Sequence, residues 1–339
     1  MICFAWSGFP QYAARCVGAF VRTTKERVNV VATRPRVPVE GMEKLAGCEV
    51  KWLDGGESGL ADICGEMPRV LFVSGWGFPV FNRFRDEVRR GGGKIVAMVD
   101  NNFVFSFREI IKAFRFRLLL RRKFDGYLVP GASGRRLLCS YGVGGKKISS
   151  GMYSADEELF SNGAELPRRQ KKILFVGQLN GRKNIVPFAQ AFLKANEKRE
   201  WQLEICGCGP LKGEIPVDET IAVHDFVQPE QLAGIYRSAR VFALPSQEEH
   251  WGLVVHEAAL SGCILLLSNQ VGAAADLLGK KNGRMFNPHS IVAMEESLRC
   301  VMSLTVDELK EAQGESLQLA RRISKQLFVD GVRRFADEC

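Results

Sequence analysis

Short apolar segments alternate with longer amphipathic segments along the first half of the chain. Segments that predict strands lie at residues 2–6, 28–32, 49–53, 70–74, 94–99 and 127–129, and 127–129 is the last well-defined strand of this half. Helical periodicity covers about residues 11–22 and 82–90. Apolar strands that alternate with helices are typical of a parallel sheet with helices on both faces.

The same alternation restarts after a polar stretch at residues 161–171. Strands are predicted at 172–176, 201–206, 221–223, 241–244 and 263–268, and helices at about 184–197, 229–238, from 252 onward, 291–303, 306–325 and 326–338, with a turn at 281–283. We therefore expect two Rossmann-like, doubly wound α/β domains that face a central cleft. Their expected bounds are 1–166 and 167–320, and a C-terminal helix at 321–339 is expected to pack back on the first domain.

The composition agrees with a soluble globular protein of two domains. The chain has 339 residues, of which 46% are hydrophobic and 25% charged. The ten cysteines are scattered, and the nearest pair, Cys206 and Cys208, lacks the spacing of a zinc site. The apolar start at residues 2–6 is too short for a signal peptide or a membrane span. We expect a reduced, cytoplasmic setting.

Positive charge is concentrated in the first half. The net charge is +9, yet residues 1–150 hold 25 Lys and Arg against 13 Asp and Glu, whereas the remainder holds 22 against 25. The stretch 103–124 carries the single acid Glu109 and seven cations: Arg108, Lys112, Arg115, Arg117, Arg121, Arg122 and Lys123. Interleaved with them are Phe103, Phe105, Phe107, Phe114, Phe116 and residues 118–120.

This basic and aromatic stretch predicts docking on an anionic membrane surface, which would place the protein peripherally on the inner face of the cell membrane. The alternative is a core helix whose polar face is basic. We expect no nucleic-acid partner, because no recognised nucleic-acid module accompanies the patch.

Candidate ligand-binding residues follow the predicted strands. In open parallel sheets ligands bind at the carboxyl ends of strands, which places Gly8, the loop 75–77 and the stretch 100–102 together. In the second half, Gly177 follows a strand and Lys183, a cation suited to a diphosphate, comes six residues later. A second tight turn contains Gly207, Gly209 and Pro210.

Two carboxylates lie within a predicted strand-loop-helix connection. Glu249 falls in the loop, and Glu257 falls on the helix that begins near Gly252. Backbone N–H groups of residues 251–253 at the helix start can bind a phosphate or a sugar hydroxyl. The alternative is an ordinary connection of an α/β domain with two solvated glutamates.

The order of these motifs resembles the retaining glycosyltransferases of family 4 (glycosyl transferases group 1), which have the two-domain GT-B fold. The resemblance is specific over about residues 172–290 and only architectural before that. It is carried by residues 175–183, 206–210 and 244–257, and continues through Gly262, Ser268, Gly272, Asp276, Asn282 and Gly283.

The resemblance implies roles for individual residues. Glu257 would bind the ribose hydroxyls, and Glu249 would act beside the transferred sugar. Lys183 would neutralise the leaving diphosphate, helped by N–H groups near Leu253 and Val254. The nucleobase would lie against residues 225–228. The full expected donor site comprises Gly8, Gly177, Gln178, Arg182, Lys183, Gly207, Gly209, Pro210, Phe226, Val227, Ser246, Glu249, His250, Trp251, Gly252, Leu253, Val254 and Glu257.

No metal and no cofactor are implied, since the sugar nucleotide, UDP- or GDP-linked, is a substrate and fixed cations can stabilise its leaving group. Two departures from the family pattern stand out. Gln178 replaces a common Arg, and all four histidines lie in the second half, so the first domain lacks the His common near the donor sugar. At the corresponding strand end we expect Asn101, with Lys183 and Glu249, to act in catalysis.

The sequence thus predicts an enzyme that transfers a sugar, with retention, to a glycan or lipid-linked acceptor in cell-surface polysaccharide or lipopolysaccharide-type synthesis. The first domain would bind the acceptor and the second the nucleotide sugar. A GT-B-fold sugar-nucleotide epimerase is one alternative, and a basic membrane- or nucleic-acid-binding module is another. A dinucleotide dehydrogenase is disfavoured, because no G-x-G-x-x-G follows the first strand.

Overall fold

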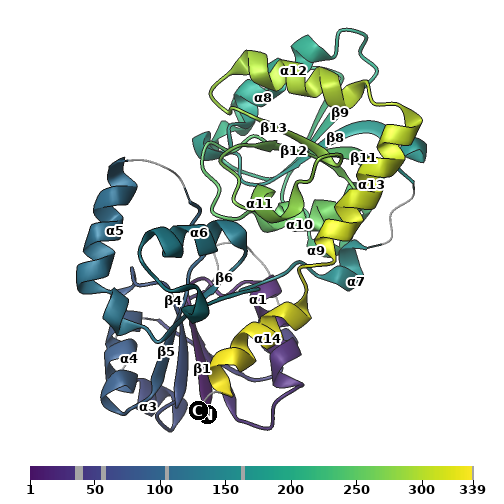
Figure 1. Cartoon of the computed structure of the whole chain (residues 1–339). Helices are drawn as coiled ribbons and strands as arrows, with labels where there is room; N and C mark the ends of the chain where they lie inside the picture. Colours follow the sequence, from purple (N-terminus) through teal and green to yellow (C-terminus); the bar gives the residue numbers. More distant parts are fainter. Residues whose placement is uncertain (35–40, 55–58, 104–106, 162–164, 338–339) are drawn as a thin grey trace. The chain divides into compact units, whose positions relative to one another are not determined.

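The chain folds into two α/β units in a computed structural model that describes residues 1–34, 41–54, 59–103, 107–161 and 165–337. Unit 1 comprises Met1–Ser154 and Ser324–Cys339, and unit 2 comprises Ala155–Ile323 (Figure 1). The expected boundary after residue 166 therefore falls inside unit 2. The expected class of fold, two Rossmann-like parallel sheets, is confirmed.

Unit 1 is built on a seven-stranded sheet with the order β3-β2-β1-β4-β5-β6-β7. Its strands are β1 (Ile2–Trp6), β2 (Val28–Ala32), β3 (Glu49–Trp52), β4 (Val70–Ser74), β5 (Lys94–Met98), β6 (Gly126–Val129) and β7 (Ile148–Ser150), and all pairs are parallel. β1 and β2 are buried along their whole length. Strands that are covered on both faces have continuous apolar sequences, so the sequence pattern predicts them clearly.

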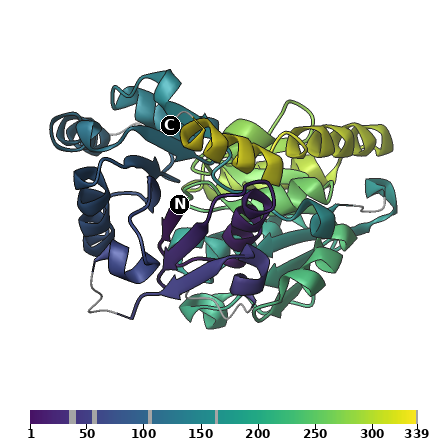
Figure 2. The same ribbon diagram turned by 90° about the horizontal axis from the view of Figure 1, so that it is seen from below.

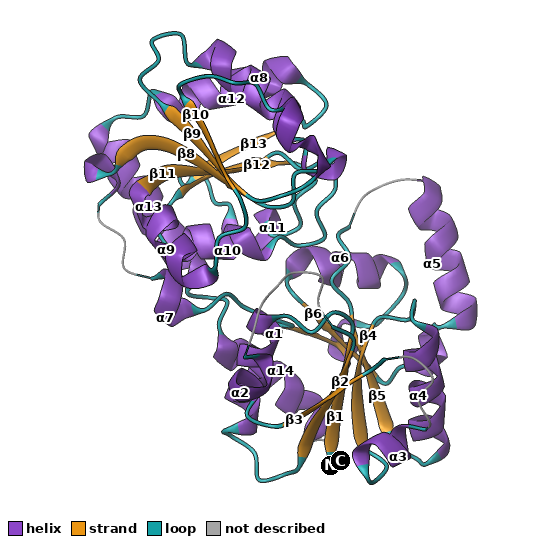
Figure 3. Ribbon diagram, turned by 180° about the vertical axis from the view of Figure 1, so that it is seen from behind, coloured by secondary structure: helices purple, strands orange, loops and turns teal. Residues whose placement is uncertain are grey.

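Helices cover both faces of this sheet (Figure 3). One face carries α1 (Gln11–Val21), α2 (Met42–Ala46) and α14 (Lys325–Ala336), and the other carries α3 (Leu60–Cys64), α4 (Pro79–Arg90) and α5 (Phe107–Leu119), while α6 (Ala132–Ser140) follows β6. α14 lies beside α1 (Figure 1, Figure 2). It is tied to unit 1 by hydrogen bonds from Arg69 to the carbonyl of Ala336 (2.7 Å) and from Arg333 to the carbonyl of Thr23 (2.9 Å).

Unit 2 has a six-stranded parallel sheet with the order β10-β9-β8-β11-β12-β13. Its strands are β8 (Gln170–Val176), β9 (Gln202–Cys206), β10 (Ile221–His224), β11 (Ala239–Leu244), β12 (Ile264–Ser268) and β13 (Gly283–Phe286). α8 (Ile185–Ala195) and α12 (Ile291–Met302) pack together on one face. The other face carries α9 (Pro229–Ser238), α10 (Leu253–Leu260), α11 (Ala274–Leu277) and α13 (Val306–Ala320), and a short α7 (Glu157–Phe160) lies beside α9 and α10 (Figure 1).

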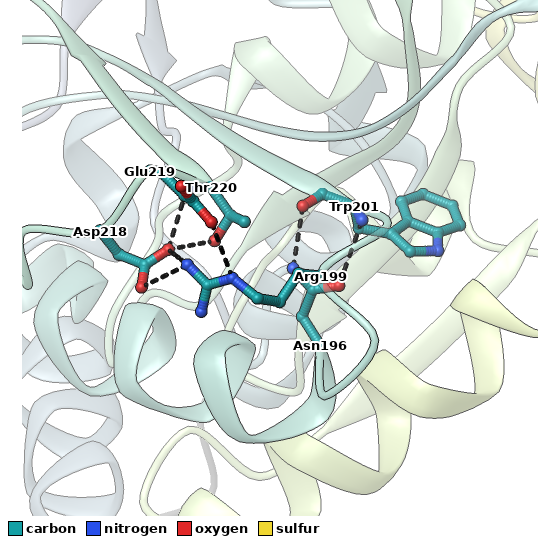
Figure 4. Close-up of polar contacts among 6 residues, drawn as sticks. All are labelled: Asn196, Arg199, Trp201, Asp218, Glu219 and Thr220. Atoms are coloured by element: carbon teal, nitrogen blue, oxygen red, sulfur yellow. Dashed lines mark hydrogen bonds and ion pairs between the residues drawn. The ribbon is translucent and has the colours of Figure 1, made fainter.

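The connections at the amino ends of these strands are pinned by polar contacts (Figure 4). Asn196 donates to the carbonyl of Trp201 (2.8 Å) and accepts from its N–H (3.1 Å). Arg199 bonds Asp218 and Glu219, each at 3.0 Å. The hydrogen bonds that Asp218 accepts from Thr220 are the main reason why the pKa of its carboxyl is lowered. This cluster lies at the amino ends of the strands and so leaves their carboxyl ends open for ligands.

Two sequence predictions need correction, and one strand was not predicted. Residues 127–129, the last well-defined strand expected in the first half, lie in β6; the unpredicted β7 follows, and its sequence Ile-Ser-Ser lacks an apolar run. The expected turn at 281–283 instead leads directly into β13, because Gly283 can pair closely with Leu265. The helix predicted over 306–325 ends at Ala320, and the Ser324 side chain caps α14 by accepting from the N–H of Leu327 (3.1 Å).

Candidate functional site

Strand order places the candidate site of unit 2 between two neighbouring strands. β8 and β11 pair side by side, and the chain leaves β8 toward β9 but leaves β11 toward β12 on the opposite side. The loops after these strands, 177–184 and 245–252, therefore begin next to each other. This is the topological switch point at which open parallel sheets bind ligands.

A buried ion pair joins the two loops. Lys183 is 7% exposed and Glu249 is 8% exposed, and the Lys183 ammonium contacts Oε2 of Glu249. Ser246 donates to the same carboxylate oxygen (3.3 Å). Lys183 ends the single turn Gly181–Lys183, where the Asn180 side chain accepts from its backbone N–H (3.2 Å). Burying opposite charges together in this way costs much less than burying either alone.

A second cation approaches the same carboxylate. The Arg182 guanidinium lies 3.7 Å from Oε1 of Glu249 and donates to the carbonyl of Glu248 (2.9 Å). Gln178, by contrast, has an exposed side chain that accepts from Asn180 (3.2 Å). One oxygen of Glu249 thus faces Lys183 and the other faces Arg182. An anionic group that took the place of this carboxylate would meet both cations.

Backbone contacts fix the loop that carries Glu249. Its N–H donates to the carbonyl of Gln270 (3.3 Å), and its carbonyl accepts from the N–H of Gly272 (3.2 Å). A Cβ atom at Gly272 would lie 2.0 Å from the carbonyl oxygen of His250, so only glycine allows the two segments to approach. Both sides of Glu249 are therefore held by the connection that follows β12.

Glu257 lies on α10, the helix that follows this loop. α10 begins at Leu253 after Gly252, which has φ 93°, so Leu253 and Val254 provide the first N–H groups of the helix. The Tyr236 hydroxyl on α9 donates to Oε2 of Glu257 (2.9 Å). Burial raises the pKa of Glu257 to about 7, and the bond from Tyr236 opposes this shift. Glu257 is half-buried, so a ligand can reach its side chain.

Tyr236 is a site residue that sequence reasoning missed. Its side chain is fully buried and its hydroxyl also contacts the carbonyl of Val254 (3.3 Å), so it orients the first turns of α10 as well as Glu257. A tyrosine on the inner face of an amphipathic helix has no local signal that separates it from an ordinary core residue. Only its tertiary contact with Glu257 reveals the role.

The glycine turns have a structural reason that the sequence did not show. A Cβ atom at Gly207 would lie 1.9 Å from the carbonyl oxygen of Gly177, and one at Gly209 would lie 2.4 Å from that of Leu179. The N–H of Leu179 also donates to the carbonyl of Cys208 (2.9 Å). These glycines therefore serve first to bring the loops after β8 and β9 into contact.

Trp251, which precedes Gly252, and His256, which precedes Glu257, both have buried rings. Trp251 is 1% exposed, so its indole packs under the loop and only its backbone can reach a ligand. His256 is fully buried; its Nδ1 accepts from the N–H of Ala155 and its Nε2 donates to the carbonyl of Ala320, both at 3.0 Å. Burial lowers the pKa of His256 to about 4.

The remaining predicted donor residues are more open. Phe226 has an exposed ring in the connection between β10 and α9, where Val227 is half-buried. Pro210 is exposed at the start of the short turn after Gly209, and His250 is half-buried beside Glu249. These positions leave side-chain surface available to a base or a sugar at the carboxyl ends of the strands.

Two predicted site residues belong to unit 1, whereas all the others belong to unit 2. Gly8 follows β1 with φ 60°, and its N–H donates to the hydroxyl of Thr33 (2.8 Å). Asn101 is exposed in the connection after β5. Within the described ranges, no group of three or more His, Cys, Asp or Glu side chains could hold a metal ion.

Comparison with known proteins agrees with this geometry. Residues 156–318 match the family model of glycosyl transferases group 1. Sequence relatives include the D-inositol 3-phosphate glycosyltransferase of Corynebacterium glutamicum, 27% identical over 56% of this chain and 51% of that protein. The sulfoquinovosyl transferase SQD2 of Arabidopsis thaliana is 26% identical over 54% of this chain and 39% of that protein. The match thus spans about half of the first relative and 39% of the second.

Solved structures resemble the whole chain. Anabaena HepE in complex with UDP and glucose has a TM-score of 0.76 at 11% identity and covers 100% of this chain and 99% of its own. Sucrose-phosphate synthase from Thermosynechococcus elongatus has a TM-score of 0.74 at 13% identity, with the same coverage. At such identities the likeness shows the fold, which is GT-B. Together with the family match, it supports a group 1 glycosyltransferase.

Proposed function

We propose that the chain transfers a sugar, with retention of anomeric configuration, from a UDP- or GDP-sugar to a glycan or lipid-linked acceptor in cell-surface polysaccharide or lipopolysaccharide-type synthesis. The observation that carries the proposal is the buried Glu249 carboxylate, bracketed by Lys183 and Arg182 at the switch point of unit 2. The match of this unit to glycosyl transferases group 1 supports the reaction class.

In the proposed reaction, the bond between the anomeric carbon and the diphosphate breaks and its electron pair moves to the leaving phosphate oxygen. The acceptor hydroxyl oxygen forms the new bond to that carbon, and its proton passes to an oxygen of the departing diphosphate. Lys183 and Arg182 stabilise the charge that builds on the diphosphate. Because fixed cations in a water-poor site can meet this need, we propose that transfer requires no metal.

Donor binding would then change the partner of Glu249. The Glu249 carboxylate contacts both cations, so a diphosphate that bound Lys183 would take its place there. The displaced carboxylate would turn to the transferred sugar, where it can accept a hydrogen bond from a hydroxyl or stabilise positive charge at the anomeric carbon.

The other end of the donor would extend toward Glu257 and the connection after β10. Ionised Glu257, oriented by Tyr236, would accept hydrogen bonds from the ribose hydroxyls. Phe226 and Val227 would provide apolar surface for the base. The complex of HepE with UDP and glucose supports a nucleoside diphosphate as the ligand class.

Unit 1 would bind the acceptor. Its Gly8 stays a proposed donor contact and its Asn101 a proposed catalytic residue, both at the carboxyl ends of strands. We further propose a cytoplasmic protein that works at the inner face of the cell membrane, where lipid-linked acceptors are available. Among the described residues, no helix has both the length and the apolar character to cross a bilayer.

The proposal is tested by incubating the chain with a panel of UDP- and GDP-sugars in the presence of EDTA. We expect release of the nucleoside diphosphate from at least one donor, and NMR of the sugar product should show the anomeric configuration of the donor. Inverted product would refute retention, and turnover that depends on added divalent metal would refute metal independence. An absence of turnover and of binding for every sugar nucleotide would refute the reaction class.

A further inference from the structure

Helix α5 of unit 1 packs on its own unit through one face. Phe116 is buried against the rings of Trp76, Tyr127 and Tyr141, with centroid distances of 5.1, 6.1 and 5.3 Å. Glu109 accepts a hydrogen bond from the Tyr141 hydroxyl (2.6 Å). These contacts fix which side of the helix faces the domain.

The opposite side of α5 is apolar and exposed. Its residues are Phe107, Ile110, Ile111, Phe114 and Leu118, which we call the outer stripe. The spacing of three, one, three and four residues places all five side chains on one face of a helix. Phe107 is 77% exposed, Phe114 65% and Leu118 67%. Large side chains exposed together in this way mark an interaction surface.

Cations border the outer stripe. Lys112 and Arg115 are exposed on α5 next to it, and the turn Arg121–Lys123 adds three exposed basic residues after the helix. The only acid of α5, Glu109, faces Tyr141 and Lys112 and is thereby removed from the outer surface. The side chain of Arg108 and residue Phe105 lie outside what the structure describes, and no part of the argument depends on them.

We propose that the outer stripe of α5 inserts into the interfacial region of a bilayer that contains anionic lipids, with the neighbouring cations on the lipid headgroups. An apolar helix face bordered by Lys and Arg is suited to lie in the plane of the interface. The 13 residues of α5 span about 20 Å, which is too short to cross the hydrocarbon core.

Charge complementarity favours this occupant over a second copy of the chain. Two copies that met stripe to stripe would bring Lys112, Arg115 and the basic turn Arg121–Lys123 of both chains together. Anionic headgroups instead offer a counter-charge along the whole border of the stripe. The inference does not depend on sugar transfer, because its residues belong to α5 and the turn after it, whereas those of the donor site belong to unit 2.

The test is co-sedimentation of the full chain with phosphatidylcholine vesicles, with and without phosphatidylglycerol. We expect binding only to the anionic vesicles. Added salt should weaken this binding, because the Debye length falls to about 10 Å at 0.1 M ionic strength and the headgroup charges are screened. Phe114→Glu with Leu118→Glu should weaken binding at least about tenfold, since each places a charge where apolar surface enters the bilayer. Lys112→Glu with Arg115→Glu should weaken binding to anionic vesicles by a similar factor.

Matched controls lie on unit 2. Val292→Glu replaces another exposed apolar helix residue, and Lys310→Glu reverses another exposed cation, so both should leave vesicle binding unchanged. Circular dichroism checks that the α5 variants remain folded. Binding that is insensitive to the outer stripe would overturn the proposal. The proposal would also be overturned if the chain did not bind the vesicles but formed a dimer that Phe114→Glu with Leu118→Glu dissociates. Nucleotide-sugar binding by the same variants should stay unchanged, which separates this test from that of the donor site.

Discussion

The two units share a topology but differ in what they place at its switch point. In unit 1 the strand order reverses between β1 and β4, and in unit 2 between β8 and β11. In unit 1 the N–H groups of Ser7 and Gly8 donate to the hydroxyls of Ser74 (3.1 Å) and Thr33 (2.8 Å). In unit 2 the same position holds the ion pair of Lys183 and Glu249. The two sheets provide the same position, and the proposed diphosphate site rests on the side chains that unit 2 places there.

Net charge alone would point to unit 1 rather than to the proposed donor site. Residues 1–150 carry the positive excess, yet Lys183, the buried cation that pairs with Glu249, lies in the part of the chain where acids outnumber bases. In unit 1 the cations near α5 are exposed, where they are hydrated and suited to a surface partner. In unit 2 Lys183 is buried, where its field acts at short range with little screening. Burial therefore distinguishes a candidate ligand site from a docking surface better than charge does.

The largest expected effect comes from removing the buried cation. Lys183→Met should lower the rate of sugar transfer by about 10²- to 10³-fold, because a preorganised charge near the leaving group is lost. It should also lower the free energy of unfolding by up to about 3 kcal/mol, since the Glu249 carboxylate stays buried without its Lys183 partner. Steady-state kinetics and urea unfolding measure the two effects.

A double variant separates stability from chemistry. Lys183→Met with Glu249→Gln removes both charges, so most of the lost stability should return while transfer stays low. Transfer that recovers together with stability would contradict a direct role of Lys183 in catalysis.

A glycine pair tests whether the loops after β8 and β9 of unit 2 pack more closely than the loop after β4 of unit 1. Gly207→Ala in unit 2 should destabilise the chain by about 3 kcal/mol, because the new Cβ would lie 1.9 Å from the Gly177 carbonyl oxygen. Gly77→Ala in unit 1 meets nothing within 4 Å and should change stability by less than about 0.5 kcal/mol. Urea unfolding compares the two. Equal costs would show that the loops of unit 2 are not packed as described.

The raised pKa of Glu257 predicts that donor binding depends on pH. With the pKa of its carboxyl raised from 4.5 to about 7, the group is protonated below that value and cannot accept two ribose hydroxyls. Affinity for a nucleotide sugar should therefore rise as pH increases through about 7. Glu257→Gln should weaken binding by about 10- to 100-fold above pH 7, as expected for lost hydrogen bonds to a charged group, and remove the pH dependence.

The raised pKa of Glu257 also makes the free energy of unfolding depend on pH, in the direction opposite to donor affinity. A folded-state pKa above the unfolded value means that the folded chain binds the proton more tightly, so the contribution of Glu257 to stability falls as pH rises from about 4.5 to about 7. Glu257→Gln should flatten that part of the stability profile. A variant with an unchanged profile would show that Glu257 titrates at its ordinary pKa.

The smallest effects concern the second cation. Arg182→Ala should weaken donor binding by about fivefold, because its guanidinium is partly exposed and its field is screened. Gln178→Arg should strengthen binding by a few-fold if the added guanidinium reaches the diphosphate. Arg199→Ala, in the cluster of Figure 4 at the amino ends of the strands, is the matched control and should leave affinity unchanged. Isothermal titration calorimetry resolves these changes, and an effect of Arg199→Ala equal to that of Arg182→Ala would remove the case for a second cation.

Sequence patterns predicted the buried parallel strands well and the short polar ones poorly. β1, β2 and β4 match the predicted bounds, because both faces of each strand are covered and the apolar run is continuous. β7 and β13 were missed, since Ser149, Ser150 and Gly283 pair through their backbones and lack an apolar pattern. The start of α8 at Ile185 agrees with the prediction, whereas α4 begins before the predicted residue 82, with Pro79 in its first turn.

The candidate site divides in a similar way. Motif spacing predicted that Lys183 and Glu249 lie near one ligand, and the structure brings them into contact. Spacing could not predict that Tyr236 orients Glu257, nor that Gly207 and Gly209 serve loop packing, because both depend on contacts between elements distant in sequence. The roles of these residues toward a donor remain predictions that binding experiments test.

The most direct test of the central claim is calorimetric titration of the full chain with UDP- and GDP-sugars in EDTA. We predict that at least one sugar nucleotide binds, that Lys183→Met with Glu249→Gln abolishes or strongly weakens this binding, and that Arg199→Ala does not. The claim that the diphosphate binds at the switch point of unit 2 would be contradicted if the double variant bound the same sugar nucleotide as tightly as the unaltered chain.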